Sequence, residues 1–189
     1  MSPKISIVEV VYSKTETEEN VWHLCKNVSE NLPDLLTECY AVFVSNDIQA
    51  VPLWCQTAGN NEHGFVQWDY HVLFIHNGKM ECLVYDLDTT LPFPCPFKEY
   101  QSKSLKNDEM LDPKFRRFFR VIPAQEYLQT FASDRSHMKK FGIWIKPPPN
   151  YDPIKTPESI HNLEKFISMN PKDGPGQVLS CKDFVEKFC

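Results

Sequence analysis

The stretch "WDYHVLFIHNGKMECLVYDLD", residues 68–88, holds two runs of strand-forming residues separated by a short break at "HNGK". Both runs are rich in β-branched and aromatic side chains, which are typical of sheet strands. Asn77-Gly78 in the break is a strong signal for a tight hairpin turn. The sequence therefore predicts an antiparallel β-hairpin, and it sets three polar side chains among the apolar residues there: His71, Asp86 and Asp88.

The register of this hairpin decides whether the polar groups can meet. A two-residue turn at Asn77-Gly78 would set His71 opposite Val84. Asp86 would then share the face of His71, with the two β-carbons within about 8 Å of each other. A four-residue loop would place Asp86 directly opposite His71, whereas a three-residue loop would turn it to the other face. Loops of even length therefore put the carboxylate within reach of the imidazole.

A histidine beside an aspartate in a buried hairpin has three chemical interpretations. It is common as a structural network of satisfied polar groups. His71 and Asp86 could equally be metal ligands, but no third ligand with sensible spacing accompanies them. As a catalytic pair, Asp86 would fix the tautomer of the imidazole, leaving the other ring nitrogen free to accept a proton from a nucleophile. The residues alone leave the structural and the catalytic interpretation open.

The segment upstream of the hairpin has the pattern of an amphipathic helix. Between residues 17 and 32 the apolar residues recur at the spacing of one helix face: Val21, Leu24, Cys25 and Val28. Thr15 or Thr17 is a plausible N-cap, and acidic residues follow it, where the helix dipole favours negative charge. Pro33 ends the helix, and a short second helix is expected over residues 33–40.

The remaining pattern predicts a mixed α+β chain with an antiparallel sheet at its centre, flanked by helices. Strands are expected at residues 5–12, 41–45, 50–54, 64–76 and 81–88, and helices at 112–122, 123–134, 161–169 and 180–188. Ser180 and Asp183 form a capping pattern for the last helix. The Pro-rich residues 145–157 are expected to cross the surface as a stiff strap. We therefore expect residues 1–189 to form one domain.

The composition argues against several classes of function. A net charge of −5 over 189 residues argues against nucleic acid as the main partner, and the basic cluster at 114–120 is interleaved with Phe and predicts an amphipathic surface segment. No apolar run reaches the roughly 18 residues of a membrane span, and the first residues lack a signal-peptide pattern. The seven cysteines include no C-x-x-C pair, which favours free thiols in a reducing cytosol or nucleus.

Several longer stretches carry a resemblance to a known family. They are "WDYHV" (68–72), "YDLDTTLPFPCPF" (85–97), "KFRRFFRVIPAQEYL" (114–128), "FASDRSHM" (131–138), "KPPP" (146–149) and "FISMNPKDGPG" (166–176). In this order they resemble the family of protein N-terminal glutamine amidohydrolases, nicknamed after its Trp-Asp-Tyr-His-Val signature, from about Tyr12 to the C-terminus. The resemblance implies a papain- or transglutaminase-like domain without a cofactor, and a monomer of the cytoplasm and nucleus.

The resemblance also implies an activity. Members of the family convert an N-terminal glutamine of a protein into glutamate and release ammonia, and arginyl transfer to that glutamate then marks the protein for degradation. A Cys-His-Asp triad performs this chemistry in the family. Its histidine, from "WDYHV", corresponds to His71, and its aspartate, the first of "DLD", corresponds to Asp86. These are the two residues that the hairpin sets together.

The nucleophile is where this chain departs from the family. The family cysteine precedes "EEN" at the start of the first long helix, and that position is Thr17 here, while Thr15 stands where relatives often carry another cysteine. A helix N-terminus lowers the pKa of a thiol, but a threonine hydroxyl is far less acidic and needs full general-base assistance. Cys25 lies about 12 Å further along the helix, and nothing marks Cys95 as activated. We therefore expect weak or absent turnover from this chain.

Recognition of such a substrate needs a carboxylate or carbonyl oxygens around the N-terminal ammonium, and a narrow slot for the amide. Candidates for the ammonium are Asp88, Asp69 and Asp134, and the rings of Trp68 and Phe93 are candidates for the walls of the slot. Residues 131–142 have the composition of a loop that closes over a peptide. The sequence leaves three functions open: an active amidase, a binder of N-terminal glutamine without turnover, and an acyl-transferring enzyme of transglutaminase type.

Overall fold

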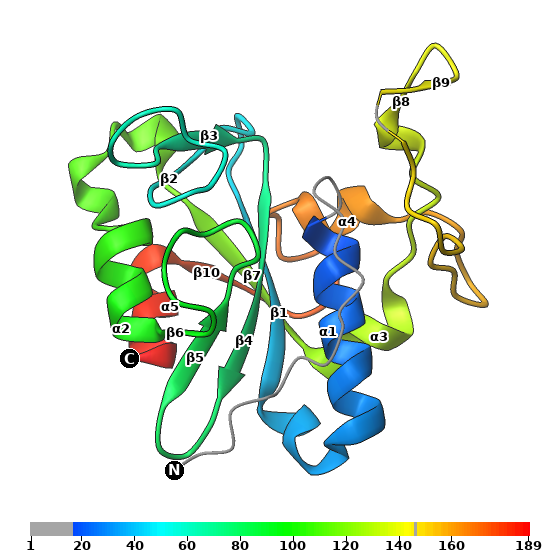
Figure 1. Ribbon diagram of the computed structural model, residues 1–189, viewed down its shortest axis with the longest axis horizontal. Coiled ribbons are helices and arrows are strands. Elements are labelled where there is room, and N and C mark those ends of the chain that lie inside the picture. The colour runs from blue at the N-terminus through cyan, green and yellow to red at the C-terminus, as the bar shows by residue number, and fades with distance from the viewer. Residues whose placement is uncertain (1–16, 146) are drawn as a thin grey trace.

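The computed structural model describes residues 17–145 and 147–189 (Figure 1). The strand expected at residues 5–12 and the alternative N-cap Thr15 lie outside the described residues. Within them, six strands form one antiparallel sheet in the order β10-β7-β1-β4-β5-β6. Their bounds are Cys39–Ser45 for β1, His71–Asn77 for β4, Cys82–Tyr85 for β5, Cys95–Pro96 for β6, Phe118–Pro123 for β7 and Gln177–Ser180 for β10. The prediction of a central antiparallel sheet is confirmed.

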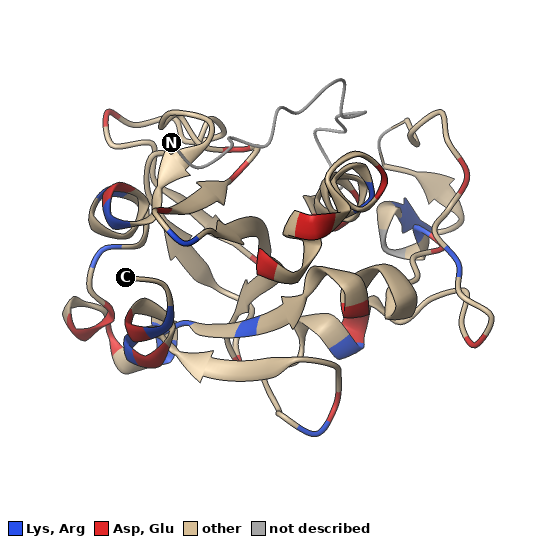
Figure 2. Ribbon diagram, turned by 90° about the horizontal axis from the view of Figure 1, so that it is seen from below, with Lys and Arg blue, Asp and Glu red and all other residues tan. Residues whose placement is uncertain are grey.

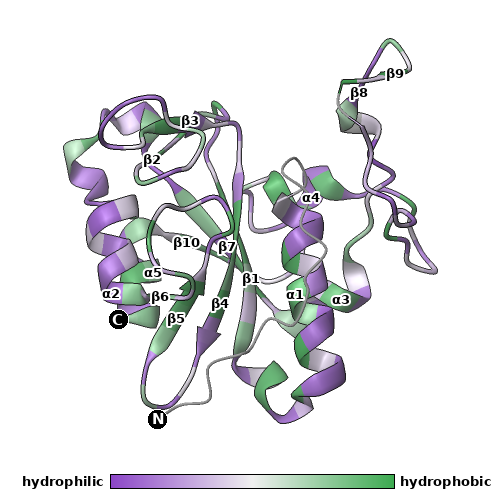
Figure 3. Ribbon diagram, viewed as in Figure 1, coloured by the Kyte–Doolittle hydropathy of each residue, from purple (hydrophilic) through white to green (hydrophobic). Residues whose placement is uncertain are grey.

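Helices cover both faces of this sheet (Figure 1). One face carries α1 (Thr17–Asn31), α3 (Ala124–Thr130) and α4 (Leu163–Ile167); the other carries α2 (Phe97–Tyr100), which continues as a π-helical turn over Gln101–Leu105, and α5 (Cys181–Phe188). Side chains of alternate residues in each strand pack into two separate apolar cores. Phe43 belongs to the core under α1, and Val42 belongs to the core under α5. Figure 3 shows hydrophobic residues along the central strands.

Smaller elements lie outside the main sheet. β2 (Val51–Leu53) pairs with β3 (Val66–Trp68), and β8 (Lys139–Lys140) pairs with β9 (Ile143–Trp144). Short 3-10 turns span Pro33–Glu38, Asp108–Met110, Pro113–Phe115 and Ser136–Met138. The single strand expected over residues 64–76 is therefore divided between β3 and β4, and the short helix expected after Pro33 is a 3-10 turn. No helix in the described part of the chain has the length and apolar composition that crossing a membrane requires.

The first long helix, α1, is confirmed together with its buried face. The four apolar residues predicted for that face are at most 1% exposed: Val21, Leu24, Cys25 and Val28. The helix ends at Asn31, ahead of Pro33. The unexpected feature is its first turn, where Glu18 and Glu19 are also 0% exposed. Because removing carboxylates from water is costly, these two side chains need partners inside the fold.

The β4–β5 hairpin forms on the predicted face but in a different register. Asn77 pairs with Cys82, so the connecting loop consists of residues 78–81. The predicted two-residue turn at Asn77-Gly78 is wrong, because that turn needs a positive φ at both central residues and neither residue has one. The loop is of even length, so His71 and Asp86 remain on one face, as predicted. The prediction that a four-residue loop sets Asp86 directly opposite His71 is wrong, because the ladder ends at Phe74 and Tyr85.

The helix expected over residues 112–122 is also wrong. After a 3-10 turn at Pro113–Phe115 the chain enters β7, which lies between β10 and β1 in the sheet. Phe119 and Val121 pack into one core while Ile122 packs into the other. The side chains of this segment therefore alternate between two faces, as in a strand, and do not follow the spacing of a helix. The edge strand β10, beside β7, is missing from the sequence prediction as well.

The basic cluster in this segment is only partly on the surface: Lys114 and Arg116 are exposed, whereas Arg117 and Arg120 are buried. Arg117 and Arg120 are 1% and 0% exposed. Arg117 forms an ion pair with Asp108, and Arg120 donates to three backbone carbonyls of residues 168–175. Both guanidinium groups therefore hold segments of the fold together. Elsewhere, basic and acidic residues are interspersed along the ribbon (Figure 2).

Candidate active site

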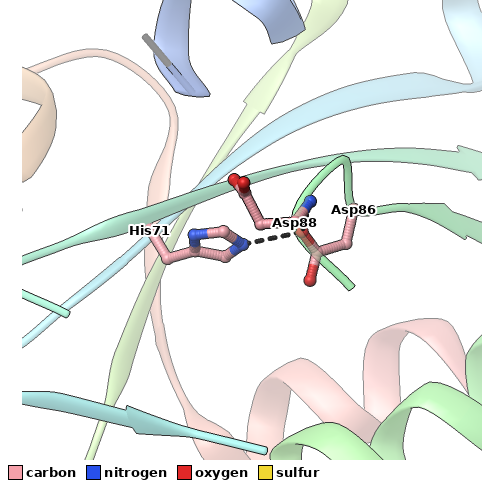
Figure 4. Close-up of side chains that lie close together, drawn as sticks. All are labelled: His71, Asp86 and Asp88. Atoms are coloured by element: carbon pink, nitrogen blue, oxygen red, sulfur yellow. Dashed lines mark hydrogen bonds and ion pairs between the residues drawn. The ribbon is translucent and has the colours of Figure 1, made fainter. Parts of the chain in front are cut away.

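His71 and Asp86 are joined by a hydrogen bond inside the protein. Nε2 of His71 lies 2.9 Å from Oδ1 of Asp86 (Figure 4), and the two residues are 0% and 2% exposed. An ionised carboxylate can only accept, so the imidazole donates from Nε2. The contact that the hairpin pattern predicted is therefore present.

The end of the β4–β5 ladder explains how Asp86 reaches the imidazole. His71 is the first residue of β4, but pairing with β5 begins only at Phe74, opposite Tyr85. Asp86 follows the last paired residue, and its Oδ1 accepts from the backbone N–H of Asp88 at 2.9 Å. An aspartate that caps its own turn in this way bends the chain tightly. The bend leaves the carboxylate facing the ring of His71.

Two further side chains hold Asp86, and neither is a candidate in the sequence. Gln56 donates from Nε2 to Oδ2 at 3.0 Å, and the phenol of Tyr100 donates to the same oxygen at 2.7 Å. Together with His71 and the Asp88 N–H, four donors surround the carboxylate. Gln56 follows β2 and Tyr100 ends α2, so no local sequence pattern connects either residue with Asp86.

Trp68 completes the surroundings of the imidazole. Its indole N–H donates to Oε1 of Gln56 at 3.1 Å, and its ring stacks on that of His71 with centroids 5.2 Å apart and an interplanar angle of 24°. Trp68, Gln56, Asp86 and His71 thus form a closed cycle of contacts. Such a cycle fixes both the position and the tilt of the imidazole, because each member restrains the next.

The surroundings move the two pKa values in opposite directions. Burial lowers the pKa of His71, but the charge of Asp86, their hydrogen bond and the charge of Asp88 together raise that pKa above its ordinary 6.5. Burial raises the pKa of Asp86, but the charge of His71 and the hydrogen bonds from His71, Gln56 and Tyr100 bring it below 3.8. The pair therefore favours an imidazolium beside a carboxylate.

These shifts also make the stability of the fold depend on pH. The raised pKa of His71 contributes stability that is present below pH 6.5 and is lost as the pH rises through the folded-state value. The lowered pKa of Asp86 contributes stability that is present above pH 3.8 and is lost as the pH falls through its folded-state value. The pair contributes most between these limits.

An NMR titration of the His71 ring is expected to give a pKa above 6.5 in the parent and below 6.5 in an Asp86→Asn variant. Removing the charge of Asp86 leaves burial, the largest single influence, to disfavour the imidazolium. Asp69→Asn is a matched control, because it neutralises an exposed carboxylate. A His71 pKa that stays above 6.5 in the Asp86→Asn variant would contradict this account of the pair.

The second ring nitrogen of His71 is open to proton transfer. Nδ1 is buried and has no hydrogen-bond partner among the described residues. A purely structural histidine normally satisfies both nitrogens, because an unpaired buried polar atom costs free energy. An imidazole held at Nε2 by a carboxylate and open at Nδ1 can take a proton from a nucleophile. The geometry therefore permits the catalytic interpretation, but the feature is not unique to His71, since in the described part of the chain buried His76 also has a carboxylate at Nε2 and an unpartnered Nδ1.

Asp88 belongs to the same cluster. One ligand atom each from His71, Asp86 and Asp88 lie within 4.8 Å of one another, and all three residues are buried (Figure 4). The expectation that no third metal ligand accompanies His71 and Asp86 is wrong, because Asp88 lies beside both in the fold. Each oxygen of Asp86 already accepts two hydrogen bonds, so a cation could bind it only by displacing donors. The arrangement suits proton transfer better than metal binding.

The first turn of α1 is fastened next to this cluster. Thr17 is the first residue of α1. The phenol of Tyr70, which directly precedes His71, donates at 3.0 Å to the side chain of Glu18, which directly follows Thr17. Tyr127 donates to the backbone oxygen of Glu18, also at 3.0 Å. A chain neighbour of His71 and a chain neighbour of Thr17 are thus in contact, which brings the leading end of α1 to the start of β4.

The remaining substrate-binding candidates are Asp69, Asp134 and Phe93, and their contacts are with groups other than the imidazole of His71. Asp69 is exposed. Asp134 pairs with His161 at 3.0 Å, and Phe93, which is 44% exposed, meets the ring of Tyr85 edge-on. Of the five candidates, the structure places Asp88 and Trp68 at the imidazole.

Neither alternative cysteine has the surroundings of a nucleophile. Cys25 and Cys95 are both 0% exposed. Burial raises the pKa of the Cys25 thiol well above its ordinary value and raises the pKa of Cys95 to about 11. Both side chains are therefore protonated near neutral pH, and a thiol is a poor nucleophile. The seven cysteines of the chain are all free, as the sequence predicted.

Known proteins are similar to this chain over nearly its whole length. A family model described as N-terminal glutamine amidase matches residues 12–188. A relative from Drosophila melanogaster, called protein N-terminal glutamine amidohydrolase, is 51% identical over 188 residues, which cover 98% of this chain and 91% of the relative. Relatives of the same name from Drosophila erecta and Drosophila mojavensis are each 50% identical with the same coverage.

Proposed function

Because this chain belongs to the family of N-terminal glutamine amidases, and so is a hydrolase, we propose that it deamidates the side chain of an N-terminal glutamine in proteins. The products are an N-terminal glutamate and ammonia. The observation that carries the proposal is the buried His71–Asp86 pair with an open Nδ1, which is the base that amide hydrolysis needs. Thr17 occupies the position of the nucleophile.

In the proposed mechanism, which uses the neutral imidazole, Oγ1 of Thr17 attacks the amide carbon of the glutamine side chain while its proton passes to Nδ1 of His71. The tetrahedral intermediate collapses when His71 returns this proton to the amide nitrogen, the C–N bond breaks and ammonia leaves. Water then attacks the resulting ester while His71 again accepts a proton, and His71 returns this proton to Oγ1 of Thr17 as the ester bond breaks, which gives glutamate and the free hydroxyl. Asp86 stabilises the imidazolium in both steps.

The first turn of α1 has a second role in this proposal. The leading N–H groups of a helix have no acceptor within the helix and carry a partial positive charge. They therefore suit the oxyanion that forms when the amide carbon is attacked. The hydrogen bonds from Tyr70 and Tyr127 to Glu18 support this role, because they hold the turn in place.

We assign recognition of the substrate ammonium to Asp88. Its carboxylate is 7% exposed and lies within the cluster around His71, and a buried carboxylate suits a cationic partner. An ammonium held there would bring the side chain of the same glutamine to the imidazole. Trp68 bounds one face of that ring. Asp134 is less suited, because it pairs with His161 and is not a member of the cluster of His71, Asp86 and Asp88.

The family resemblance extends the proposal to the cell. An N-terminal glutamate is an acceptor for arginyl transfer, so the reaction would feed the arginine branch of the N-degron pathway. In the same proposal the protein is a monomer of the cytoplasm and nucleus, built as one papain- or transglutaminase-like domain. A six-stranded antiparallel sheet with α1 packed on one face supports that architecture.

A second function, binding of N-terminal glutamine without turnover, is favoured by the identity of residue 17. The hydroxyl of Thr17 is only weakly acidic, and its added methyl restricts the side-chain rotamers that could aim the oxygen at a substrate. A chain with Asp88, His71 and Asp86 in place would still recognise the substrate. Binding and turnover are therefore measured separately.

Peptides that differ only in their first residue test the proposal. We expect the Gln-initiated peptide to bind at least about tenfold more tightly than Glu- or Asn-initiated peptides in calorimetry, and to release ammonia. Acetylation of its amine should weaken binding, and Asp88→Asn should abolish the difference between free and acetylated peptides. Selective binding without ammonia supports the second function. Equal binding of all three peptides contradicts both functions, and ammonia release that requires an added amine indicates acyl transfer.

A further inference from the structure

Residues 133–145 and 147–162 form an arm whose end projects from the body of the protein; the arm is drawn in yellow and orange in Figure 1. Its base is closed by a backbone hydrogen bond from Ser133 to Ile154 at 2.9 Å. The side chain of Asn162 donates to the carbonyl of Thr130 at 2.7 Å and accepts from the N–H of Ala132 at 2.9 Å. The arm therefore starts and ends at one firmly bonded point.

The root of the arm is tied to the first turn of α1. The guanidinium of Arg135, which is 3% exposed, donates to Glu19 through Nε at 2.9 Å and through its terminal nitrogen at 2.8 Å. A two-point contact of this kind fixes direction as well as distance. Glu19 lies two residues after Thr17, so the arm projects from the side of the molecule where the proposed nucleophile lies.

The end of the arm carries an unusual concentration of exposed apolar side chains. Phe141, Ile143 and Ile145 are 94%, 73% and 62% exposed, and Trp144 is 37% exposed. We call these four residues the apolar tip. They are four of the eleven large hydrophobic residues that are exposed in the described part of the chain, and they fall within five positions. Single exposed apolar residues are ordinary, but a contiguous group marks a contact surface.

The backbone at the tip holds these side chains in the open. Lys140 pairs with Ile143, so Phe141 and Gly142 form a two-residue turn, with φ values of 52° and 79°. Two positive φ values are the pattern of a tight hairpin turn. Glycine adopts that conformation freely, but a phenylalanine there is strained. Strained positions of this kind concentrate at binding sites.

The stem of the tip is basic. Lys139 and Lys140 make up β8, which is blue in Figure 2, and both are exposed. Nζ of Lys139 lies over the Trp144 ring, 4.4 Å from its centroid. The chain as a whole has a net charge of −5, so this positive stem is a local departure that favours acidic partners.

We propose that the apolar tip binds the substrate polypeptide downstream of its N-terminal residue, and that it favours segments in which apolar residues stand beside acidic ones. This inference rests on the proposed function. A protein that presents its first residue to the imidazole must lead the rest of its chain away over the neighbouring surface, and the arm is rooted there through Arg135 and Glu19. The two lysines supply the charge complementarity.

Peptide length separates this role from the chemistry. The probes are a Gln-initiated tripeptide and two peptides of about 20 residues with the same first three, long enough to reach the tip at about 3.3 Å per extended residue. One long peptide continues with Leu, Phe, Asp and Glu, and the other with Ser and Gly. Rates of ammonia release are measured in a Thr17→Cys background, and binding is measured in the parent.

Replacing Ile143 and Ile145 together by serine is expected to raise KM and Kd for the apolar-acidic peptide by about tenfold. Values for the tripeptide and the Ser-Gly peptide should not change. Lys140→Glu should weaken binding of the same peptide, and added salt should reduce that effect. Met110→Ser is the matched control, because Met110 is 85% exposed outside the arm.

The inference is overturned if the double variant affects all three peptides equally, or none of them. It is also overturned if sedimentation shows that the variant changes only self-association, since the tip would then be an interface between copies. Failure of the proposed function looks different: the tripeptide itself would be neither bound nor hydrolysed.

Discussion

Replacing Thr17 with cysteine is expected to raise the rate of ammonia release from a Gln-initiated peptide by about a thousandfold or more, because loss of a nucleophile typically costs several orders of magnitude. A thiol at the N-terminus of α1 titrates below its ordinary value of about 8.5 and is present as thiolate near neutral pH beside an imidazolium. The raised pKa of His71 favours that imidazolium. A hydroxyl cannot exploit either effect.

The matched control is Thr17→Ser, which removes the methyl group but keeps the hydroxyl. It should stay within about tenfold of the parent, since acidity rather than bulk limits the reaction. Initial rates of ammonia release from one peptide, measured for the three proteins side by side, give the comparison. If the parent and the cysteine variant both release ammonia rapidly, the hydroxyl of residue 17 does not limit the reaction. If both release ammonia slowly, residue 17 is not the nucleophile position.

Asp86→Asn in the Thr17→Cys background is expected to lower kcat by about ten-thousandfold. The carboxylate accepts from four donors through two oxygens. An asparagine side chain offers one oxygen, so two of those donors would face an amide NH₂. The imidazole would lose both its fixed tautomer and the charge that stabilises its protonated form.

The pH profile of activity distinguishes the expected fall in kcat of the Asp86→Asn variant from simple unfolding. The variant should keep cooperative thermal unfolding while the acid limb of its residual activity moves to lower pH, because the pKa of His71 falls. Asp47→Asn, at an exposed position, should leave rate and profile unchanged. A kcat within tenfold of the Thr17→Cys parent would show that Asp86 does not support the base.

The parts of the fold that could be predicted were those specified by local pattern. The face of α1 follows from four apolar residues at helical spacing, and the N-cap of α5 follows from Ser180, whose hydroxyl accepts from the N–H of Asp183. The failures came where two local signals competed. Asn77-Gly78 looks like a tight turn, yet Asn77 stays in the ladder opposite Cys82. In residues 112–122 the basic residues indicate a surface, because the sequence does not reveal that Arg117 pairs with Asp108 or that Arg120 donates to carbonyls 48 to 55 positions away.

The residues of the site also fall into those that local sequence pattern predicts and those that it does not. His71 and Asp86 could be found because one hairpin joins them, 15 positions apart. Gln56 reaches Asp86 from 30 positions away, and Arg135 reaches Glu19 from 116 positions away. Contacts at such separations depend on how the layers pack, which a single sequence does not reveal. The sequence marks Asp88 as a candidate, but its place within the cluster depends on the fold.

The bond between Arg135 and Glu19 has a consequence for how the molecule opens. Both side chains are almost fully enclosed, so detaching either segment would strand an uncompensated charge inside the protein. The start of α1 and the root of the arm therefore unfold locally as one cooperative unit, although they are far apart in the chain. We expect a disturbance that reaches either segment to be transmitted to the other through this charged contact.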